Sequence, residues 1–296
     1  MMEQGYGSTP DKRRLAANFS DAAAGYDAVA ILQKEVADAL LERLDIMNVR
    51  PHWILDLGSG TGGAARQLAR RYSGCRVLQL DLARNMLLQA RKQSRRWFSR
   101  QSFVCAEAAA LPVQAGALDL VYSSLMLQWC EDLDAVLSEI RRGMRGGGLF
   151  LFSSLGPDTL HELRDSWAEA DDDGFMHVNG FRDMHEVGDA LIRAGFADPV
   201  MEVDHMILTY SRVRDLMREL KQLGARNVST GRRRALTGKR RLQTMMEAYE
   251  KYRREGRIPA TYEVVYGHAW VPEGRPLPRP QDGVVTIPVE SIGRRG

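Results

Sequence analysis

A glycine-rich segment that begins with a carboxylate is the first feature of this chain able to do chemistry. Residues 56–63 read DLGSGTGG, directly after the apolar run Trp53–Leu57 and before a stretch with helical spacing. Glycines at such a junction allow a tight turn and bring backbone N–H groups close to a ligand. Gly58, Gly60 and Gly63 also satisfy the pattern G-x-G-x-x-G, which NAD enzymes share. The segment by itself therefore predicts a nucleotide site without saying which nucleotide it takes.

Two carboxylates favour S-adenosylmethionine as that nucleotide. Asp56 stands two residues before the first glycine of the segment. A carboxylate there suits the cationic amino group of a methionine moiety and would repel a pyrophosphate. Asp81 ends the next apolar run, where a carboxylate about 20 residues downstream accepts hydrogen bonds from ribose hydroxyls. NAD also has such a ribose, so the discrimination between the two nucleotides depends on Asp56.

The residues after the second and third apolar runs resemble those of class I methyltransferases. Leu82–Leu87 follows Asp81, and Cys105–Ala108 stands shortly before Leu111-Pro112. In that class an acidic residue at the third strand contacts the adenine amino group; this chain has Glu107 there, where Asp is usual. The resemblance and the two carboxylates together imply these cofactor-binding residues: Tyr26, Asp56, Gly58, Ser59, Gly60, Gly62, Asp81, Leu82, Met86, Ala106, Glu107, Ala108, Ser123 and Ser124.

Alternating apolar runs and amphipathic segments define the elements that position these residues. The expected strands are Trp53–Leu57, Val77–Leu80, Phe103–Cys105, Leu118–Ser123, Leu149–Ser153, Met201–Leu208 and Tyr262–Val271. The expected helices are Leu32–Leu44, Ala64–Tyr72, Asn85–Ser94, Asp134–Met144 and Met184–Ala194. This alternation predicts an α/β fold with a Rossmann-like, doubly wound sheet of seven strands, mostly parallel with one antiparallel edge strand. Ligands of such sheets bind at the carboxyl ends of the strands.

The expected organisation adds a helical lid to this core. We divide the chain into an N-terminal helical segment (1–45), a cofactor-binding core (46–210), a basic helical lid insertion (211–258), the last core strand (259–272) and a flexible tail (273–296). Phe19–Asp27, inside the first segment, is expected to be a loop or short helix. The tail has several prolines and few large apolar residues, which is typical of loosely packed chain.

Composition excludes several other classes. No apolar run approaches the ~18 residues needed to cross a bilayer, and the N-terminus lacks the apolar segment of a signal peptide. Cys75, Cys105 and Cys130 have no metal-ligand spacing, and three is an odd number for a disulfide framework. The net charge of +3 is small for a nucleic-acid-binding protein. We therefore expect a cytoplasmic enzyme, monomeric, with no metal and no membrane or nucleic-acid partner.

The methyl acceptor is suggested by the segment after the fourth strand. Ser123–Met126 departs from the Asn/Asp-Pro-Pro-aromatic signature of amine and nucleic-acid base methylases. The chain instead resembles the BioC family, the malonyl-acyl-carrier-protein O-methyltransferases of bacterial biotin synthesis. Most specific to that family are Gln128-Trp129-Cys130 and Leu220-Lys221-x-x-Gly224-Ala225; further matches lie in 19–27, Leu32-Gln33-x-Glu35, 155–163, Gly195-Phe196-Ala197, Gly231-Arg232 and Thr261-Tyr262-Glu263. The resemblance implies methyl transfer to the free carboxylate of malonyl-acyl-carrier protein, giving the methyl ester that primes pimeloyl synthesis.

This chemistry requires alignment more than proton transfer. A malonyl carboxylate has a pKa of roughly 4, so it is already anionic at neutral pH and needs no general base. A cradle must still hold that anion, because an unpaired buried charge is costly. The candidates are Tyr26, Trp129, Arg164, Arg226, Thr261 and Tyr262. The basic lid would attract an acidic carrier protein, with docking contacts expected among Arg232, Arg233, Arg234, Arg240 and Arg241.

Other functions remain open at this point. Residues 156–164 and 259–262 also resemble a mitochondrial complex I assembly factor, a methyltransferase-like family associated with arginine hydroxylation of a protein subunit. A small-molecule carboxyl or quinone-precursor methylase, a non-catalytic binding module and a nucleic-acid methylase are further alternatives. The last is disfavoured because aromatic stacking residues are scarce in the basic lid. An NAD-dependent oxidoreductase fits least, because of Asp56.

Overall fold

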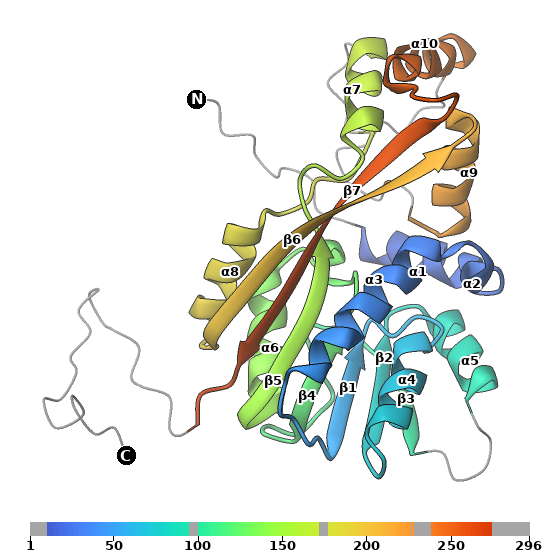
Figure 1. The fold of residues 1–296 in the computed structure, drawn as a ribbon. Helices are drawn as coiled ribbons and strands as arrows, with labels where there is room; N and C mark the ends of the chain where they lie inside the picture. Colours follow the sequence, from blue (N-terminus) through green and yellow to red (C-terminus); the bar gives the residue numbers. More distant parts are fainter. Residues whose placement is uncertain (1–10, 95–99, 172–176, 226, 228–237, 274–296) are drawn as a thin grey trace, which may run out of the picture.

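The computed structural model describes residues 11–94, 100–171, 177–225, 227 and 238–273, and a single seven-stranded sheet organises them (Figure 1). The strand order is β3-β2-β1-β4-β5-β7-β6. The strands are β1 (Trp53–Leu57), β2 (Arg76–Asp81), β3 (Gln101–Cys105), β4 (Leu118–Ser123), β5 (Met144–Leu155), β6 (Ala197–Tyr210) and β7 (Ile258–Trp270). The predicted mostly parallel α/β sheet is confirmed. Its antiparallel strand, β7, lies one position in from the edge, between β5 and the edge strand β6.

Alternate residues of the central strands enter two apolar cores, one on each face of the sheet. On one face Ile54, Leu120 and Leu151 pack with helices α3 (Ile31–Glu42) and α4 (Gly63–Arg71). On the other face Leu55, Val121 and Phe150 pack with α6 (Leu133–Gly143) and α8 (Met184–Arg193). Burial on both faces explains why these strands are nearly continuous apolar runs in the sequence.

The N-terminal helices cross the carboxyl ends of the strands. Helix α1 (Lys12–Ala22) packs against α5 (Arg84–Gln93), and the short α2 (Tyr26–Val29) leads into α3. The expected loop or short helix at Phe19–Asp27 thus comprises the end of α1, a turn and the start of α2. The 3-10 turn Arg43–Asp45 completes the helical segment predicted at Leu32–Leu44.

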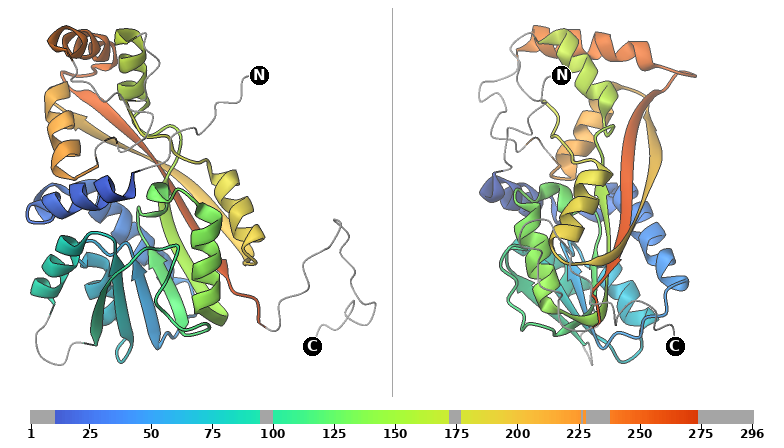
Figure 2. Two further views of the ribbon diagram at one scale, coloured as in Figure 1. Left: turned by 180° about the vertical axis from the view of Figure 1, so that it is seen from behind. Right: turned by 90° about the vertical axis from the view of Figure 1, so that its left-hand side faces the viewer.

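Strands β6 and β7 extend past the rest of the sheet and support a second group of helices (Figures 1 and 2). From Ile258 to Glu263, β7 pairs with β6 beyond the end of its pairing with β5. Helices α7 (His161–Ala170), α9 (Val213–Gln222) and α10 (Lys239–Tyr249) gather there and are called the cap below. Its apolar residues Leu163, Trp167 and Tyr249 belong to the same core as one face of the sheet.

Helix α7 of the cap differs from the sequence expectation in two ways. Helix α7 was not predicted, because two of its four buried residues, Glu162 and Ser166, are polar and leave only Leu163 and Trp167 as an apolar signal. It packs against α10 although it lies within the segment assigned to the core. The tail from residue 274 lies outside the described residues. None of the helices in the described part of the chain is both long and apolar enough to cross a membrane.

Candidate active site

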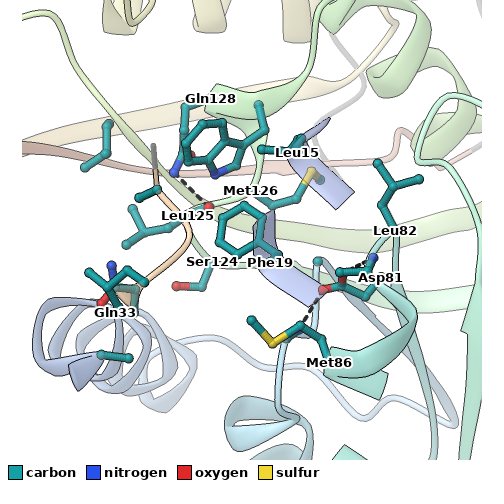
Figure 3. Close-up of a pocket in the computed structure, with 18 of the residues that line it drawn as sticks. Leu15, Phe19, Gln33, Asp81, Leu82, Met86, Ser124, Leu125, Met126 and Gln128 are labelled. Atoms are coloured by element: carbon teal, nitrogen blue, oxygen red, sulfur yellow. Dashed lines mark hydrogen bonds between the residues drawn. The ribbon is translucent and has the colours of Figure 1, made fainter. Parts of the chain in front are cut away.

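A cavity of about 930 Å³ opens at the carboxyl ends of β1, β2 and β4, below α1 and beside the cap (Figure 3). Figure 3 shows side chains entering it from both sides: Asp81, Leu82 and Met86 from β2 and α5, and Gln33 from α3. Ser124, Leu125, Met126 and Gln128 line it between them. This is the position at which parallel α/β sheets bind their ligands.

The glycine loop after β1 has a backbone conformation that requires glycine at three positions. Gly58, Gly60 and Gly62 all have positive φ values (75°, 53° and 77°), which L-residues rarely adopt. The N–H groups of Gly58 and Ser59 donate to the carbonyl of Leu80 at 2.8 and 3.0 Å. A Cβ on Gly62 would lie 2.4 Å from Oε1 of Gln79, so this glycine faces the sheet and does not line the cavity. Gly60 has open space around it and faces the cavity.

Asp81, at the end of β2, joins this loop to the start of α5. Its carboxylate accepts hydrogen bonds from the backbone N–H groups of Gly60 at 2.8 Å and Ala83 at 2.7 Å. Burial raises the pKa of Asp81, while the N–H groups of Ala83, Gly60 and Leu82 oppose that rise. The carboxylate is thereby fixed on the cavity wall in an orientation suited to accepting hydroxyl donors.

Asp56, at the end of β1, carries the clearest unmet polar requirement. Its side chain is 2% exposed, and Oδ2 has no hydrogen-bond partner among the described residues. Burial raises the pKa of Asp56 to about 7, while the Ala65 N–H opposes the rise and the nearby Asp81 charge adds to it. The Oγ of Ser59, also buried in the cavity wall, lacks a partner in the described part of the chain as well. A ligand with a cationic amino group would satisfy this wall.

Helices α1 and α2 close the cavity from above. Phe19 packs edge-on against the Trp129 indole with ring centroids 5.6 Å apart. Lys12 forms an ion pair with Glu107, and this pairing raises the pKa of the lysine. Tyr26 lines the cavity, and burial together with the charges of Asp81 and Asp27 raises its pKa. Lys12 and Phe19 are thus site residues that the sequence reasoning did not select, although Phe19 begins one of the motifs that resemble the BioC family.

Two strained residues shape the other end of the cavity. Leu125 and Leu160 have φ values of 50° and 53°, which are costly for residues other than glycine. The N–H of Leu125 donates to the carbonyl and to the Oγ of Ser153, both at 3.1 Å, and that of Leu160 to the carbonyl of Thr261 at 2.7 Å. Backbone strain of this kind concentrates at ligand sites. With Leu163, Met217 and Trp167, these residues give this end a mainly apolar wall.

Most of the predicted site residues line this one cavity, and a few do not. Those that line it are Tyr26, Asp56, Gly58, Ser59, Gly60, Asp81, Leu82, Met86, Ala106, Glu107, Ala108, Ser124, Trp129 and Tyr262. Gly62, Ser123, Arg164 and Thr261 lie off it. Ser123 donates to the carbonyl of Leu57 at 3.0 Å, and Arg164 is exposed on α7. Arg226 lies outside the described residues.

Thr261 has a structural partner instead of a cavity-facing position. Its hydroxyl donates to Oε1 of Glu162 at 2.5 Å, and its backbone N–H to Oε2 at 3.1 Å. Glu162 is itself buried, with 2% of its surface exposed. The pair joins α7 of the cap to β7 of the sheet.

The cavity offers no activated thiol, and a metal site could form only elsewhere in the described residues. Cys130 lines the cavity, but burial raises its pKa to about 12, so the thiol stays protonated at neutral pH. Asp158, His205 and Glu263 have ligand atoms within 4.8 Å of one another. None of these three residues lines the cavity. What the cavity itself can supply is orientation, hydrogen bonding and exclusion of water.

The mostly parallel sheet with its antiparallel strand β7, the glycine loop after β1, the unpartnered Asp56 carboxylate and the acidic residue ending β2 together fit a methyltransferase of the Rossmann-like type. Residues 55–152 match the family described as "Methyltransferase domain". A proposed methyltransferase from Bacillus halodurans has the same fold, with a TM-score of 0.55 at 17% identity, covering 80% of this chain and 98% of that one.

Sequence comparison gives a narrower assignment. The chain is 50% identical to the malonyl-[acyl-carrier protein] O-methyltransferase of Laribacter hongkongensis, over 92% of this chain and 94% of that protein. It is 45% identical to the protein of that name from Halorhodospira halophila, over 99% of both chains. The chain therefore belongs to the family of malonyl-[acyl-carrier protein] O-methyltransferases, and the resemblance to BioC is confirmed.

Proposed function

We propose that this enzyme transfers a methyl group from S-adenosylmethionine to the free carboxylate of malonyl-acyl-carrier protein, giving the methyl ester that primes pimeloyl synthesis for biotin. Family membership supports the acceptor. The observation that carries the cofactor assignment is the buried Oδ2 of Asp56, which has no partner in the described residues and belongs to a residue that lines the same cavity as Asp81. An amino acid joined to a nucleoside has the cation and the sugar that these two carboxylates require.

Each half of the cavity has a distinct task in this reaction. S-adenosylmethionine supplies an electrophilic methyl group on a sulfonium. Asp56 and Ser59 hold the amino-acid end, Asp81 holds the sugar, and Glu107 with Leu82 and Met86 receives the adenine. Glu107 would exchange its ion pair with Lys12 for an adenine amino group, which keeps a donor on its carboxylate throughout.

The acceptor half serves mainly to align the carboxylate and to exclude water. Trp129 and Tyr262 supply an indole N–H and a phenol beside the apolar wall of Leu125 and Leu160. The thiol of Cys130 and the carboxylates of the cofactor half have no acid–base role, because the malonyl carboxylate is already ionised. Orientation of this kind can supply up to ~7–11 kcal/mol of a barrier.

The carrier protein is proposed to dock on the basic surface of the cap. Of the predicted contacts, Arg240 is exposed, whereas Arg241 forms an ion pair with the buried carboxylate of Asp171 at 3.2 Å and so also serves the fold. Arg232, Arg233 and Arg234 lie outside the described residues. Helix α9 adds Arg214, Arg218 and Lys221, which are exposed and spaced to share one face; Lys221 also lines the cavity.

Two further expectations belong to this proposal. We place the enzyme in the cytoplasm, an expectation that agrees with the three free cysteines Cys75, Cys105 and Cys130, and we expect it to be a monomer. Gel filtration with light scattering would test the monomer: a mass of twice the chain's 33.2 kDa would contradict it.

The activity is tested by intact-mass analysis of the carrier protein. Malonyl-acyl-carrier protein incubated with the enzyme and methyl-labelled S-adenosylmethionine should gain one labelled methyl group that is lost on mild alkaline hydrolysis. Acetyl-acyl-carrier protein, which lacks the carboxylate, should gain none. Label appearing instead on a small carboxylate, a quinone precursor or a protein side chain, with malonyl carrier protein unlabelled, would favour the alternative of a methyltransferase with another acceptor.

A further inference from the structure

The unpartnered buried polar atoms of the described residues concentrate on the cavity wall, and two of those on the wall are not explained by the cofactor. Buried side-chain atoms without a hydrogen-bond partner in the described residues are Asn18 Nδ2, Gln33 Oε1, Asp56 Oδ2, Ser59 Oγ, Gln79 Oε1 and Gln128 Oε1. Four of these six residues line the cavity: Gln33, Asp56, Ser59 and Gln128. Buried polar groups in native proteins are normally satisfied, so an unmet group at a cavity indicates a partner in the filled site, either a ligand atom or an ordered water.

Gln128 can offer only an acceptor. Its amide nitrogen donates to the carbonyl of Leu125 at 2.7 Å, which fixes the orientation of the amide and leaves Oε1 as the group without a partner. An acceptor oxygen cannot bind a carboxylate. Gln128 therefore does not explain how the acceptor anion is held.

Gln33 differs because none of its amide atoms is engaged within the described part of the chain. It stands on the third residue of α3 and projects into the cavity from the side opposite Met86 (Figure 3). A primary amide has two N–H donors and one acceptor oxygen, and rotation about its last bond exchanges them. Gln33 can therefore turn an N–H toward an anion without breaking an existing hydrogen bond.

The position of Gln33 is fixed relative to the acceptor half. The phenol of Tyr122 donates to the carbonyl of Ala37 at 3.0 Å, which ties α3 to β4. Ala37 lies four residues after Gln33, and hence on the same face of the helix, and it also lines the cavity. Tyr122 is two residues before Ser124 at the tip of β4. Gln33 thus lies on the face of α3 that lines the cavity, and α3 is anchored to β4 by the Tyr122 hydrogen bond.

We propose that Gln33 is a specificity-determining residue that donates a hydrogen bond to the carboxylate of the methyl acceptor; this rests on the proposed function. A neutral donor fits the reaction better than a cation does. A tight ion pair would withdraw charge from the attacking oxygen, whereas an amide N–H orients the carboxylate and leaves it nucleophilic. An acceptor that lacks the carboxylate leaves this amide unmet, and sites built this way reject such analogues strongly.

The test compares the affinities of malonyl- and acetyl-acyl-carrier protein for enzyme saturated with S-adenosylhomocysteine, measured by calorimetry. The two ligands share all carrier-protein contacts, so the ratio of their dissociation constants reports the carboxylate alone. In the wild type the ratio should favour malonyl. Gln33→Met, which keeps the length of the side chain but removes the donors, should reduce the ratio at least about ten-fold. Gln33→Glu should reduce it further.

Controls separate this proposal from the proposed function. Gln243→Met changes a glutamine of α10 that pairs with Glu247 away from the cavity, and it should leave the ratio unchanged. A wild type without preference for malonyl would contradict the proposed acceptor itself. A wild-type preference retained by Gln33→Met, or a ten-fold loss of S-adenosylmethionine affinity with the ratio intact, would overturn the role of Gln33 alone.

Discussion

The carboxylate of Asp81 accepts a hydrogen bond from the Gly60 N–H at 2.8 Å, so the end of β2 directly holds the glycine loop that follows β1. The same carboxylate accepts the Ala83 N–H at 2.7 Å at the start of α5. Asp81 therefore does two things: it fixes the geometry of the loop and it presents oxygen acceptors to the ligand. Asp56, by contrast, has an oxygen without a protein partner in the described residues. Substitution of the two carboxylates should therefore change the stability of the free enzyme in opposite directions, although both substitutions weaken cofactor binding.

Asp81→Ala should lower both stability and cofactor affinity. The Gly60 and Ala83 N–H groups lose their acceptor, which we expect to cost about 1–2 kcal/mol of unfolding free energy. The affinity for S-adenosylmethionine should fall at least ten-fold, because the sugar loses its acceptor as well. Urea denaturation and calorimetric titration measure the two effects. A variant as stable as the wild type would show that the loop does not depend on this side chain.

Asp56→Asn should weaken cofactor binding but stabilise the free enzyme at alkaline pH. Burial raises the pKa of Asp56 to about 7 in the folded chain, above its ordinary unfolded value near 4. The folded state therefore binds a proton that the unfolded state has released, and stability declines as pH rises from about 4 through 7. Asn removes this decline. Melting temperatures at pH 5 and pH 8 should differ less in the variant, with the variant more stable at pH 8.

The same pKa predicts proton release on cofactor binding. A cation beside Asp56 lowers its pKa, so at pH 6.5–7 the wild type should release a fraction of a proton when it binds S-adenosylmethionine. Calorimetry in two buffers of different ionisation enthalpy measures that number. Equal release from wild type and Asp56→Asn would assign the proton to another group.

Much of this arrangement follows from the sequence, because parallel strands bring the residues after their carboxyl ends to one edge of the sheet. That rule placed Asp56, Asp81, Glu107 and Ser124 together correctly. It fails where position depends on tertiary packing. Thr261 stands in a family motif, yet its hydroxyl is used by Glu162, a contact 99 residues away in sequence. Helix α7 is likewise held by its packing against α10, which periodicity does not show.

The sequence also does not show which residues of a helix face a ligand when only a few of them do. Lys12 and Phe19 lie on the cavity side of α1, whose sequence KRRLAANFSDA has a single buried residue, Leu15. Gln33 stands in the motif Leu32-Gln33-x-Glu35, which resembles the BioC family. Only the absence of hydrogen-bond partners in the described structure distinguishes it from a surface glutamine. The signal for these residues is the unmet hydrogen bond, which needs three-dimensional structure.

Substitutions of Gly62 and Gly60, two of the glycines of the loop, should separate folding from binding. Gly62→Ala places a Cβ 2.4 Å from Gln79 Oε1 and 3.0 Å from the Ala90 Cβ, at a φ of 77°, and should cost roughly 1–3 kcal/mol of stability. Gly60→Ala meets open space at a φ of 53° and should cost about 1 kcal/mol, while its methyl group narrows the cavity and weakens S-adenosylmethionine binding. Thermal unfolding and cofactor titration of both variants test this contrast. Equal losses of stability would contradict the assigned orientations.

Thr261→Val should act on stability and leave the acceptor KM unchanged. Valine keeps the shape of the side chain but removes the hydroxyl that donates to buried Glu162, at a cost of about 1–3 kcal/mol. Tyr262→Phe is the matched variant at the neighbouring position, which does line the cavity. Steady-state kinetics well below the melting temperature should show a raised acceptor KM for Tyr262→Phe alone. A raised KM for Thr261→Val would place its hydroxyl in the acceptor site.

Charge reversal on α9 should weaken carrier-protein recognition specifically. Arg214 and Arg218 are exposed and four residues apart on the face that leads to Lys221 at the cavity. Arg214→Glu with Arg218→Glu should raise the KM for malonyl-acyl-carrier protein about five- to ten-fold at low salt, and the difference should shrink as salt screens the charges. Malonyl-pantetheine, which lacks the carrier protein, should be methylated equally by both enzymes. Arg91→Glu with Lys92→Glu reverses two exposed charges on α5, outside the cap, and should leave both substrates unaffected. Equal effects of the two double variants on the carrier protein would mean that net charge, and not the α9 face, attracts it.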